Sequence, residues 1–233
     1  MNKRIVITGA TKGIGLALAK KFAAEGWDLA VCARTKKDLQ TLAAKIKNPK
    51  SRILAVTCDV SKKSEVKNFA TKVLKTFGQV DVLVNNAGIF LPGKVINEKD
   101  GTLEKLMETN LYSAYHLSRL LLPPMLKQKS GHIFNLCSVA SIQAYPNGGS
   151  YSISKFALLG LSKALREELK PHHVKVTALI AGATYTDSWS GTHLPESRFM
   201  KAEDIAQAIW DVYHLSENTV VEEILLRPVK GDI

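Results

Sequence analysis

The chain has 233 residues, of which 45% are apolar and 23% are charged, and these proportions are ordinary for a soluble globular protein. A chain of this length buries about 70% of its unfolded surface, so it needs neither disulfides nor a metal to fold. The N-terminal apolar run breaks at Gly9 and Lys12, too early for a signal peptide. No run approaches the roughly 20 apolar residues of a membrane helix, so we expect a soluble cytoplasmic protein with no membrane partner.

The net charge is +11, with a sequence pI near 9.5, a balance that favours anionic partners. The basic residues are scattered and no aromatic residues interleave them, so they indicate a solvated surface and we predict no nucleic-acid partner. Three widely spaced cysteines, Cys32, Cys58 and Cys137, are typical of reduced thiols in an intracellular protein. The histidines are dispersed, and we predict no metal site.

Short apolar runs alternate with longer helical patterns along the chain. The predicted strands cover Arg4–Thr8, Asp28–Ala33, Arg52–Cys58, Val80–Val84, Gly131–Cys137, Val174–Ile180 and Val220–Arg227. The predicted helices cover Gly15–Glu25, Lys36–Lys47, Ser61–Phe77, Thr102–Lys127, Tyr151–Lys170 and Ala202–His214. This alternation predicts an α/β fold, a single doubly wound Rossmann-type domain over residues 1–233 with a mostly parallel seven-stranded sheet. Pro123-Pro124 should bend or end the long fourth helix.

A glycine-rich turn joins the first predicted strand to the first helix. It reads Thr8-Gly9-Ala10-Thr11-Lys12-Gly13-Ile14-Gly15. Gly9 permits a tight turn, Gly13 permits a close approach of a pyrophosphate, and Gly15 lets the helix pack near the strand. The positive end of the helix then faces the phosphates. Glycines in a turn are weak evidence alone, but the strand–turn–helix context strengthens the interpretation as a dinucleotide site.

The spacing of this turn, T-G-x-x-x-G-x-G, resembles the fingerprint of the short-chain dehydrogenase/reductase family. The other motifs of that family follow in order: Asn85-Asn86-Ala87-Gly88, Asn110, Ser138, and Tyr151 with Lys155. The resemblance extends from Thr8 to the last predicted strand. It implies an oxidoreductase that binds a nicotinamide cofactor and acts on a small molecule.

The end of the second predicted strand indicates which cofactor is used. An acid there would bind the 2′-hydroxyl of NAD, whereas an arginine accommodates a 2′-phosphate. The strand ends in Arg34 without an acid, and Lys12 adds a second cation in the glycine turn. Arginine pairs with phosphate through charge-assisted hydrogen bonds, and both positions match those that the family uses for NADP(H).

The resemblance assigns further cofactor contacts. Asp59 and Val60 would lie beside the adenine, although Asp59 is nearly as well explained as a helix cap or turn residue. Asn86, Ala87 and Gly88 would line the cofactor and brace the central sheet. The full predicted set is Gly9, Thr11, Lys12, Gly13, Ile14, Gly15, Arg34, Asp59, Val60, Asn86, Ala87, Gly88, Tyr151, Lys155 and Thr186.

Carbonyl reduction needs a hydride and a proton, and Tyr151 is the expected proton donor. Tyr151 and Lys155 are four residues apart at a predicted helix start, so they share a face. The nearby ammonium and the helix N-terminus should both favour the phenolate and lower the pKa of the tyrosine. By resemblance, Ser138 holds the substrate oxygen, and Asn110 holds a water beside Lys155 and completes the predicted catalytic set.

The sequence departs from the family after the sixth predicted strand, where Ala181-Gly182 replaces Pro-Gly and frees one φ angle. The segment from Tyr185 to Met200 should cap the substrate pocket, with Trp189, His193, Pro195 and Phe199. Another apolar wall is expected from Ala140, Ile142, Tyr145 and Pro146.

The resemblance implies a small carbonyl or alcohol as the substrate, and an acyl thioester on an acidic carrier protein is one candidate. Two long helices are apolar on more than one face, so we expect a homodimer or homotetramer.

The sequence thus predicts an NADP(H)-dependent oxidoreductase that moves a hydride between nicotinamide and a carbonyl or secondary alcohol. A non-catalytic regulator that binds NADPH is the main alternative, and the intact set of Asn110, Ser138, Tyr151 and Lys155 argues against it. A basic nucleic-acid-binding protein on a Rossmann-like fold is a third hypothesis, which steep salt dependence of binding would support.

Overall fold

The computed structural model describes residues 2–46 and 48–233. Its centre is one sheet of seven strands in the order β3-β2-β1-β4-β5-β6-β7, and every neighbouring pair is parallel. The predicted fold class is confirmed, with a sheet that is parallel throughout. The strands are β1 (Arg4–Thr8), β2 (Asp28–Ala33), β3 (Ile53–Thr57), β4 (Val82–Asn85), β5 (Gly131–Ser138), β6 (Val174–Ala181) and β7 (Glu223–Leu226).

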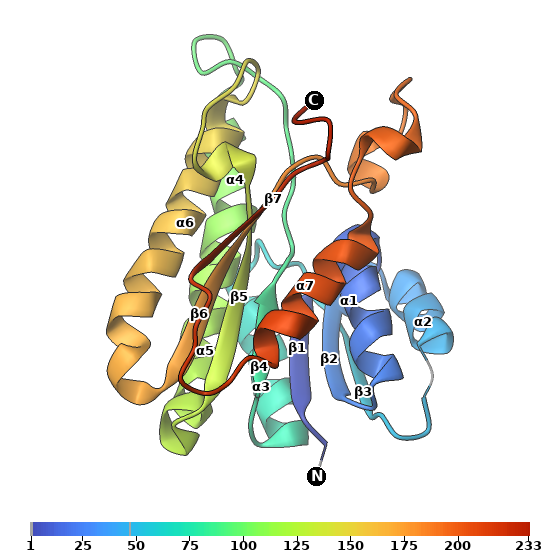
Figure 1. The fold of residues 1–233 in the computed structure, drawn as a ribbon, viewed down its shortest axis with the longest axis vertical. Helices are drawn as coiled ribbons and strands as arrows, with labels where there is room; N and C mark the ends of the chain where they lie inside the picture. Colours follow the sequence, from blue (N-terminus) through green and yellow to red (C-terminus); the bar gives the residue numbers. More distant parts are fainter. Residues whose placement is uncertain (1, 47) are drawn as a thin grey trace.

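Helices cover both faces of this sheet (Figure 1). Helices α1, α2 and α7 pack on one face, and α3, α5 and α6 pack on the other. The helices are α1 (Gly13–Ala24), α2 (Lys36–Lys45), α3 (Lys63–Phe77), α4 (Thr102–Met107), α5 (Ser113–Gln128), α6 (Gly149–Leu169) and α7 (Ala202–Tyr213). Shorter turns are η1 (Glu108–Tyr112), η2 (Val139–Ser141), η3 (Lys170–His172), η4 (Asp187–Trp189) and η5 (Glu196–Arg198).

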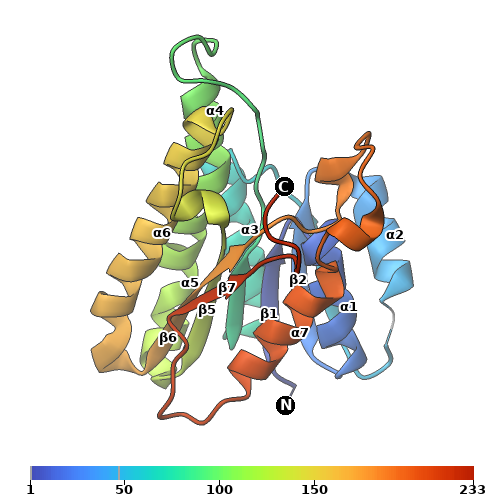
Figure 2. The ribbon, with the colours of Figure 1, turned by 45° about the horizontal axis from the view of Figure 1, so that its top comes forward.

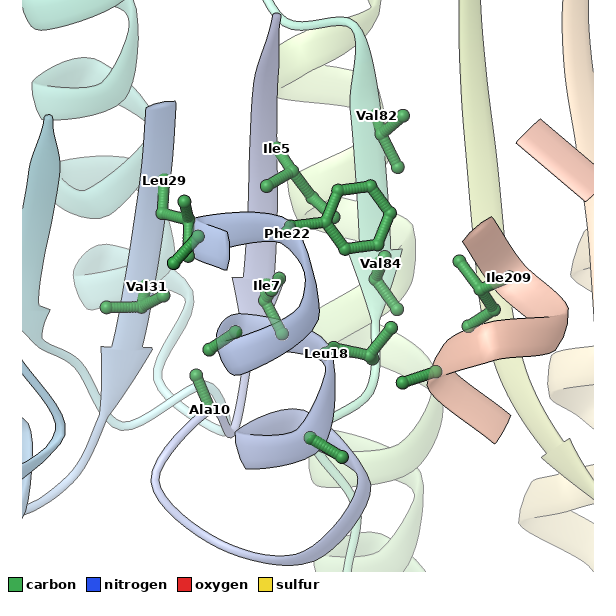
Figure 3. Packing of buried hydrophobic residues seen from close by; sticks show 14 of the residues in the cluster. Ile5, Ile7, Ala10, Leu18, Phe22, Leu29, Val31, Val82, Val84 and Ile209 are labelled. Carbon is green, nitrogen blue, oxygen red and sulfur yellow. The ribbon is translucent and has the colours of Figure 1, made fainter. Parts of the chain in front are cut away.

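Successive strand residues serve opposite faces, which explains why the strands read as continuous apolar runs. Ile5 and Ile7 of β1 pack with α1 and α7, whereas Val6 packs with α3 and α5. Figure 3 shows Phe22 of α1 lying over Ile5 and Val82 in the first of these layers. Every residue of β1 is buried, and Ile5, Val6 and Ile7 are fully so, so this central strand joins the two cores.

Helix boundaries differ in detail from the sequence prediction. Helix α6 begins at Gly149, two residues before the predicted start, and β7 is shorter than the predicted 220–227 run. The predicted end of the second helix, Lys47, lies outside the described residues. Terminal turns depend on tertiary contacts that local propensity does not encode, which accounts for shifts of this size.

The predicted fourth helix is a helical run of three parts, α4, η1 and α5. Segment η1 is a π-helical turn, which inserts extra backbone into the helix. Pro123 and Pro124 do not end the helix, because α5 continues to Gln128. Burial of Leu121 and Met125 on either side of the two prolines offsets the cost of their missing amide hydrogen bonds.

All seven strands point the same way, so their carboxyl ends meet at one edge of the sheet. Figure 2 shows two irregular segments at this edge: the β4–α4 loop stands beside α6, and the segment after β6 stands beside α1 and α2. The strand order reverses direction between β1 and β4. Ligands of open α/β sheets bind at such a reversal, outside the carboxyl ends of the strands.

Candidate active site at the carboxyl edge of the sheet

The glycine turn lies between β1 and α1 and is fixed to the end of β2. The amides of Gly9 and Ala10 donate to the Cys32 carbonyl, at 3.0 and 3.3 Å. Gly9 and Gly13 have φ angles of 64° and 50°, in the left-handed region that glycine adopts without strain. A Cβ at Gly15 would lie 2.3 Å from the Gly9 carbonyl oxygen. The turn therefore requires glycine, as its predicted role demands.

The start of α1 has the character of an anion site. Lys12 is its N-cap residue and makes no capping hydrogen bond through its side chain, and the first turn contains no acid. The amides of the first turn of a helix have no partner within the helix, and the helix dipole adds positive potential there. Thr11 and Ile14 complete the turn, both partly buried. These residues fit a pyrophosphate.

Asn86 ties the glycine turn to the turn that follows β4. Its Nδ2 donates to the carbonyls of Thr8 and Gly9, at 2.8 and 3.1 Å. In return, Thr8 Oγ1 accepts from the amides of Asn86 and Ala87, at 3.0 and 2.9 Å. The two turns therefore form one rigid unit at the switch point of the sheet. This clasp agrees with the bracing role that the sequence assigned to Asn86.

The two cations predicted for a 2′-phosphate lie at the rim of the same edge. Arg34 follows β2 and is exposed. Lys12 Nζ forms an ion pair with Asp187 at 2.7 Å. Through its hydrogen bond and its charge, Asp187 raises the pKa of Lys12, and the charge of Asp38 acts in the same direction.

Asp59 makes the local contacts of a turn residue. Its Oδ1 accepts from the amide and the hydroxyl of Ser61, at 3.0 and 2.8 Å. Val60 packs against the apolar layer beneath α3. The turn interpretation of Asp59 thus has direct support, while its contact with an adenine stays a prediction.

Ser138 and Tyr151 meet at the carboxyl end of β5. Ser138 caps the short helix η2: its Oγ accepts from the Ala140 amide at 3.1 Å, and Ser141 Oγ accepts from the Ser138 amide at 3.1 Å. This reciprocal capping fixes the orientation of the serine. Tyr151 lies in the first turn of α6, and its phenol shares a hydrogen bond with the Ser138 hydroxyl.

The protonation of Tyr151 differs from the sequence expectation. Burial raises the pKa of Tyr151, and the hydrogen bond from Ser138 lowers it without offsetting the burial. Lys155 Nζ donates to the Leu136 carbonyl at 2.7 Å and lies 5.9 Å from the centre of the Tyr151 ring. Burial also lowers the pKa of Lys155, although the Cys137 thiol opposes this. The expected acidification by the lysine is therefore wrong for this form of the protein, since desolvation dominates.

Asn110 lies in the π-helical turn η1, and its side chain makes hydrogen bonds with the backbone of the β4–α4 loop. Its Oδ1 accepts from the Ile89 amide at 2.8 Å, and its Nδ2 donates to the Ile89 carbonyl at 3.0 Å. Nδ2 also donates to Ser154 Oγ at 2.9 Å. A Cβ at Gly88 would lie 3.2 Å from Asn110 Oδ1 and 3.6 Å from Lys155 Nζ. Asn110 thus lies near Lys155, as the resemblance implied, and it also pins the loop beside Tyr151.

Phe90 is a site residue that the sequence analysis did not single out. Its ring meets the Tyr151 ring edge-on, with centroids 4.9 Å apart, and 43% of its surface is exposed. It follows Asn-Ala-Gly-Ile at the carboxyl edge of the sheet, and this position was the available signal. Burial and the neighbouring Tyr151 raise the pKa of Tyr145 to about 12. Phe90 and Tyr145 therefore border the reactive phenol.

Two cavities lie near these residues, one lined in part by Tyr145 and the other by Gly13 and Thr186. One of about 520 Å³ lies between the loop at Gly93–Val95, Tyr145 and the outer face of α6 at Ile153 and Phe156. Tyr145, one of the residues predicted to form an apolar wall of the substrate pocket, lines this cavity. Another of about 510 Å³ lies between α1 and the segment after β6, including Tyr185 and Trp189.

Thr186 lies against the glycine turn, since a Cβ at Gly13 would come 2.8 Å from its methyl carbon. Ala181, which stands where the family has proline, is the last residue of β6 and pairs with Leu226 of β7.

The chain is similar to known proteins over nearly its whole length. The family model described as short chain dehydrogenase matches residues 3–196. A protein named sepiapterin reductase from Chlorobaculum tepidum is 34% identical over 241 residues, covering 100% of this chain and 99% of that protein. A protein of Staphylococcus epidermidis named 3-oxoacyl-acyl-carrier-protein reductase FabG is 32% identical over 220 residues, covering 90% of each.

Two solved structures are close in fold. An alcohol dehydrogenase from the archaeon Thermococcus sibiricus, complexed with 5-hydroxy-NADP, superposes with a TM-score of 0.92 at 30% identity, covering 100% of this chain and 99% of that one. A metagenomic short-chain oxidoreductase in complex with NADP gives a TM-score of 0.85 at 31% identity, covering 97% of each chain. The chain belongs to the short-chain dehydrogenase family of oxidoreductases.

Three further features of the described residues bear on the kind of protein. Within residues 2–46 and 48–233, no helix is both long and apolar enough to cross a membrane. In that same part of the chain, no group of three or more His, Cys, Asp or Glu side chains is arranged to hold a metal ion. The three cysteines are free and buried.

Proposed function

We propose that this protein is an NADP(H)-dependent oxidoreductase that transfers a hydride between nicotinamide and the carbon of a carbonyl or secondary alcohol. The observation that carries this proposal is the meeting of Tyr151 with Ser138 beside Lys155, at the same carboxyl edge of the sheet as the glycine turn. A phenol hydrogen-bonded to a second hydroxyl, at the ligand-binding edge of the sheet, is suited to donating a proton to a substrate oxygen.

The residues that would hold the cofactor are those of the glycine turn and its surroundings. The first amides of α1 would bind the pyrophosphate, and Arg34 with Lys12 would bind the 2′-phosphate. Asn86, Ala87 and Gly88 would line the cofactor, Asp59 and Val60 would border the adenine, and Thr186 would contact the nicotinamide amide. The related alcohol dehydrogenase and metagenomic oxidoreductase, crystallised with 5-hydroxy-NADP and NADP, support the choice of NADP(H).

The cofactor supplies the hydride, and the side chains of the chain handle the substrate oxygen. Ser138 holds that oxygen by a hydrogen bond while Tyr151 transfers its phenolic proton to it. Because burial raises the pKa of Tyr151, the phenol is protonated at neutral pH and ready to donate. Lys155 would bind the nicotinamide ribose and, with Asn110, lie on the route by which the phenolate regains a proton.

The substrate is a small carbonyl compound with an apolar or aromatic group beside the reacting carbon. Phe90 and Tyr145 present aromatic surface next to Tyr151. The relatives include proteins named as reductases of sepiapterin and of an acyl-carrier-protein thioester. A net charge of +11 would favour an acidic carrier protein as the donor of such a thioester.

The test is consumption of NADPH, followed at its absorbance, with ketones, diketones, quinones and ketoacyl thioesters. Tyr151→Phe should lose turnover by about 100-fold or more, the usual contribution of a positioned proton donor, while NADPH binding measured by calorimetry is retained. Tyr115→Phe, which removes a hydroxyl on an exposed face of α5, is the matched control and should keep wild-type turnover. Undiminished turnover in Tyr151→Phe would refute the mechanism, and NADPH binding without turnover of any substrate would favour the regulator.

A further inference from the structure

The two ends of the segment between β6 and α7 lie side by side. Thr184 and Met200 pair as an isolated parallel bridge. The Tyr185 amide donates to the Met200 carbonyl at 2.9 Å, and the Met200 amide donates to the Ala183 carbonyl at 3.0 Å. These bonds tie the two ends of the segment together, so the residues between them project as one closed loop.

This loop meets the glycine turn at two consecutive residues. Thr186 packs its methyl group on Gly13, and Asp187, the first residue of η4, pairs with Lys12 at 2.7 Å. Trp189 ends η4 and its ring packs on Phe199 at 4.9 Å. The ion pair thus connects the cofactor-binding turn directly to the loop that borders the site.

Asp187 places a carboxylate on a cation that the proposed function assigns to the cofactor. A lysine ammonium is a point charge whose attraction is shared among the anions around it. A second acid, Asp38 in the first turn of α2, already acts on Lys12 from the side of Arg34. A 2′-phosphate that reaches Lys12 must displace the Asp187 carboxylate or sit beside it against like-charge repulsion.

We propose that Asp187 competes with the 2′-phosphate of NADP(H) for Lys12, and so sets the affinity for NADPH and its preference over NADH. This inference rests on the proposed function, because it takes NADP(H) as the cofactor and Lys12 as one of its phosphate ligands.

Asp187→Asn tests this directly, because asparagine keeps the size of the side chain and removes its charge. Dissociation constants for NADPH and NADH are measured by calorimetry on the purified full chain at low salt. NADPH should bind about two- to five-fold more tightly to the variant, the effect of one exposed ion pair, and NADH should gain less. Glu167→Gln is the matched control, since it removes another exposed carboxylate from an ion pair, with Lys170, far from the turn. It should leave both constants unchanged.

A double variant tests whether the effect of Asp187 acts through Lys12. In a Lys12→Met background, Asp187→Asn should no longer tighten NADPH, because no shared cation remains. Weaker or unchanged NADPH binding in Asp187→Asn, or equal gains for NADPH and NADH, would overturn the inference. If the wild-type chain binds no NADPH at all, the proposed function fails instead, so the two failures are distinguishable.

Discussion

At the scale of single residues, burial decides the chemistry of the proposed site. Spacing alone places Tyr151 and Lys155 on one face of a helix, and the structure keeps them there. Spacing does not reveal that the Lys155 ammonium is bonded to the Leu136 carbonyl while the phenol is bonded to Ser138. Desolvation raises the pKa of Tyr151, and the hydrogen bond with Ser138 acts in the opposite direction without offsetting it.

The raised pKa of Tyr151 predicts different pH dependences for carbonyl reduction and alcohol oxidation. Because the pKa of Tyr151 is raised above its ordinary value of 10, the neutral phenol that carbonyl reduction needs persists from pH 6 to beyond 9. Alcohol oxidation needs the phenolate, so kcat/KM for oxidation should rise with pH through 9. Steady-state kinetics in both directions, with one ketone and its alcohol, measure the two profiles.

Ser138→Ala sharpens this prediction, because it removes the hydrogen bond that lowers the pKa of Tyr151. The pH at which kcat/KM for oxidation is half-maximal should move upward, even if the maximal value of kcat/KM falls. The other ionisable groups near Tyr151 are Tyr145, Cys137 and Lys155. An oxidation rate that is already maximal at pH 7 would show that the phenol is acidified and that burial does not control it.

At the scale of elements, buried polar side chains join parts of the fold that are distant in sequence. The π-helical turn places Asn110 against Ile89 and Ser154, and Ser154 Oγ donates to the Tyr151 carbonyl at 2.7 Å. One asparagine therefore connects the β4–α4 loop to the turn of α6 that carries Tyr151. A comparable link joins β5, β6 and the chain before β7 through His132.

The hydrogen bonds of His132 should make the free energy of unfolding depend on pH. His132 Nε2 lies 2.7 Å from Thr177 Oγ1, which donates to the Val221 carbonyl at 2.6 Å, so the imidazole is neutral and donates from Nε2. Desolvation, and then Lys175, lower the pKa of His132 to about 3. The unfolded chain protonates this histidine below its ordinary pKa of 6.5, so stability is lost as pH falls from 6.5 toward 3 and is unaffected above that window. The loss at pH 5 is about 2 kcal/mol.

Urea unfolding at pH 8, 6.5 and 5 measures this effect in wild type and in His132→Gln, which keeps a donor but does not titrate. The variant should lose about 2 kcal/mol less between pH 8 and pH 5 than the wild type. His172→Gln, at an exposed position in η3, serves as the control and should follow the wild type. An identical acid dependence in wild type and His132→Gln would contradict the prediction.

At the scale of the whole molecule, the parallel sheet brings every loop of chemical interest to one edge, and it leaves an apolar face uncovered elsewhere. That face is on α6 and the adjoining η1 and α5, and its large side chains are 38–47% exposed: Tyr112, Tyr115, Ile153 and Phe156. Exposed aromatic and aliphatic groups gathered in this way are typical of protein–protein interfaces. A second copy of the chain, related by a two-fold axis, can cover this face with its own.

We therefore predict a homodimer or homotetramer in solution, and Phe156→Glu should shift it to the monomer. A buried charge without a partner at the centre of an interface costs several kcal/mol, enough to dissociate a micromolar dimer. Sedimentation velocity at micromolar concentration gives the mass of each variant. Leu215→Glu, at another exposed apolar position after α7, should leave the assembly unchanged, and a monomeric wild type would disprove the expected oligomer.

Much of the fold was predictable because the local pattern of apolar residues indicates where the strands and helices lie. The mostly apolar runs Arg4–Thr8 and Asp28–Ala33 coincide with strands β1 and β2, because the inner residues of a strand that is covered on both faces are apolar. The prolines in α5 misled the local argument, since the burial of Leu121 and Met125 that holds the helix together is a tertiary property. The π-helical turn at Asn110 had no local signature for the same reason.

By itself, the sequence determined the strand–helix order, the glycine turn and the positions of the predicted site residues, because each depends on spacing along a few residues of backbone. The tertiary structure decided which groups touch: Lys12 with Asp187, Asn110 with Ile89, and Phe90 with Tyr151. It also decided the direction of every pKa shift. Such contacts join residues far apart in the chain, and burial is set by all the elements packed around a group, so neither can be read from local spacing.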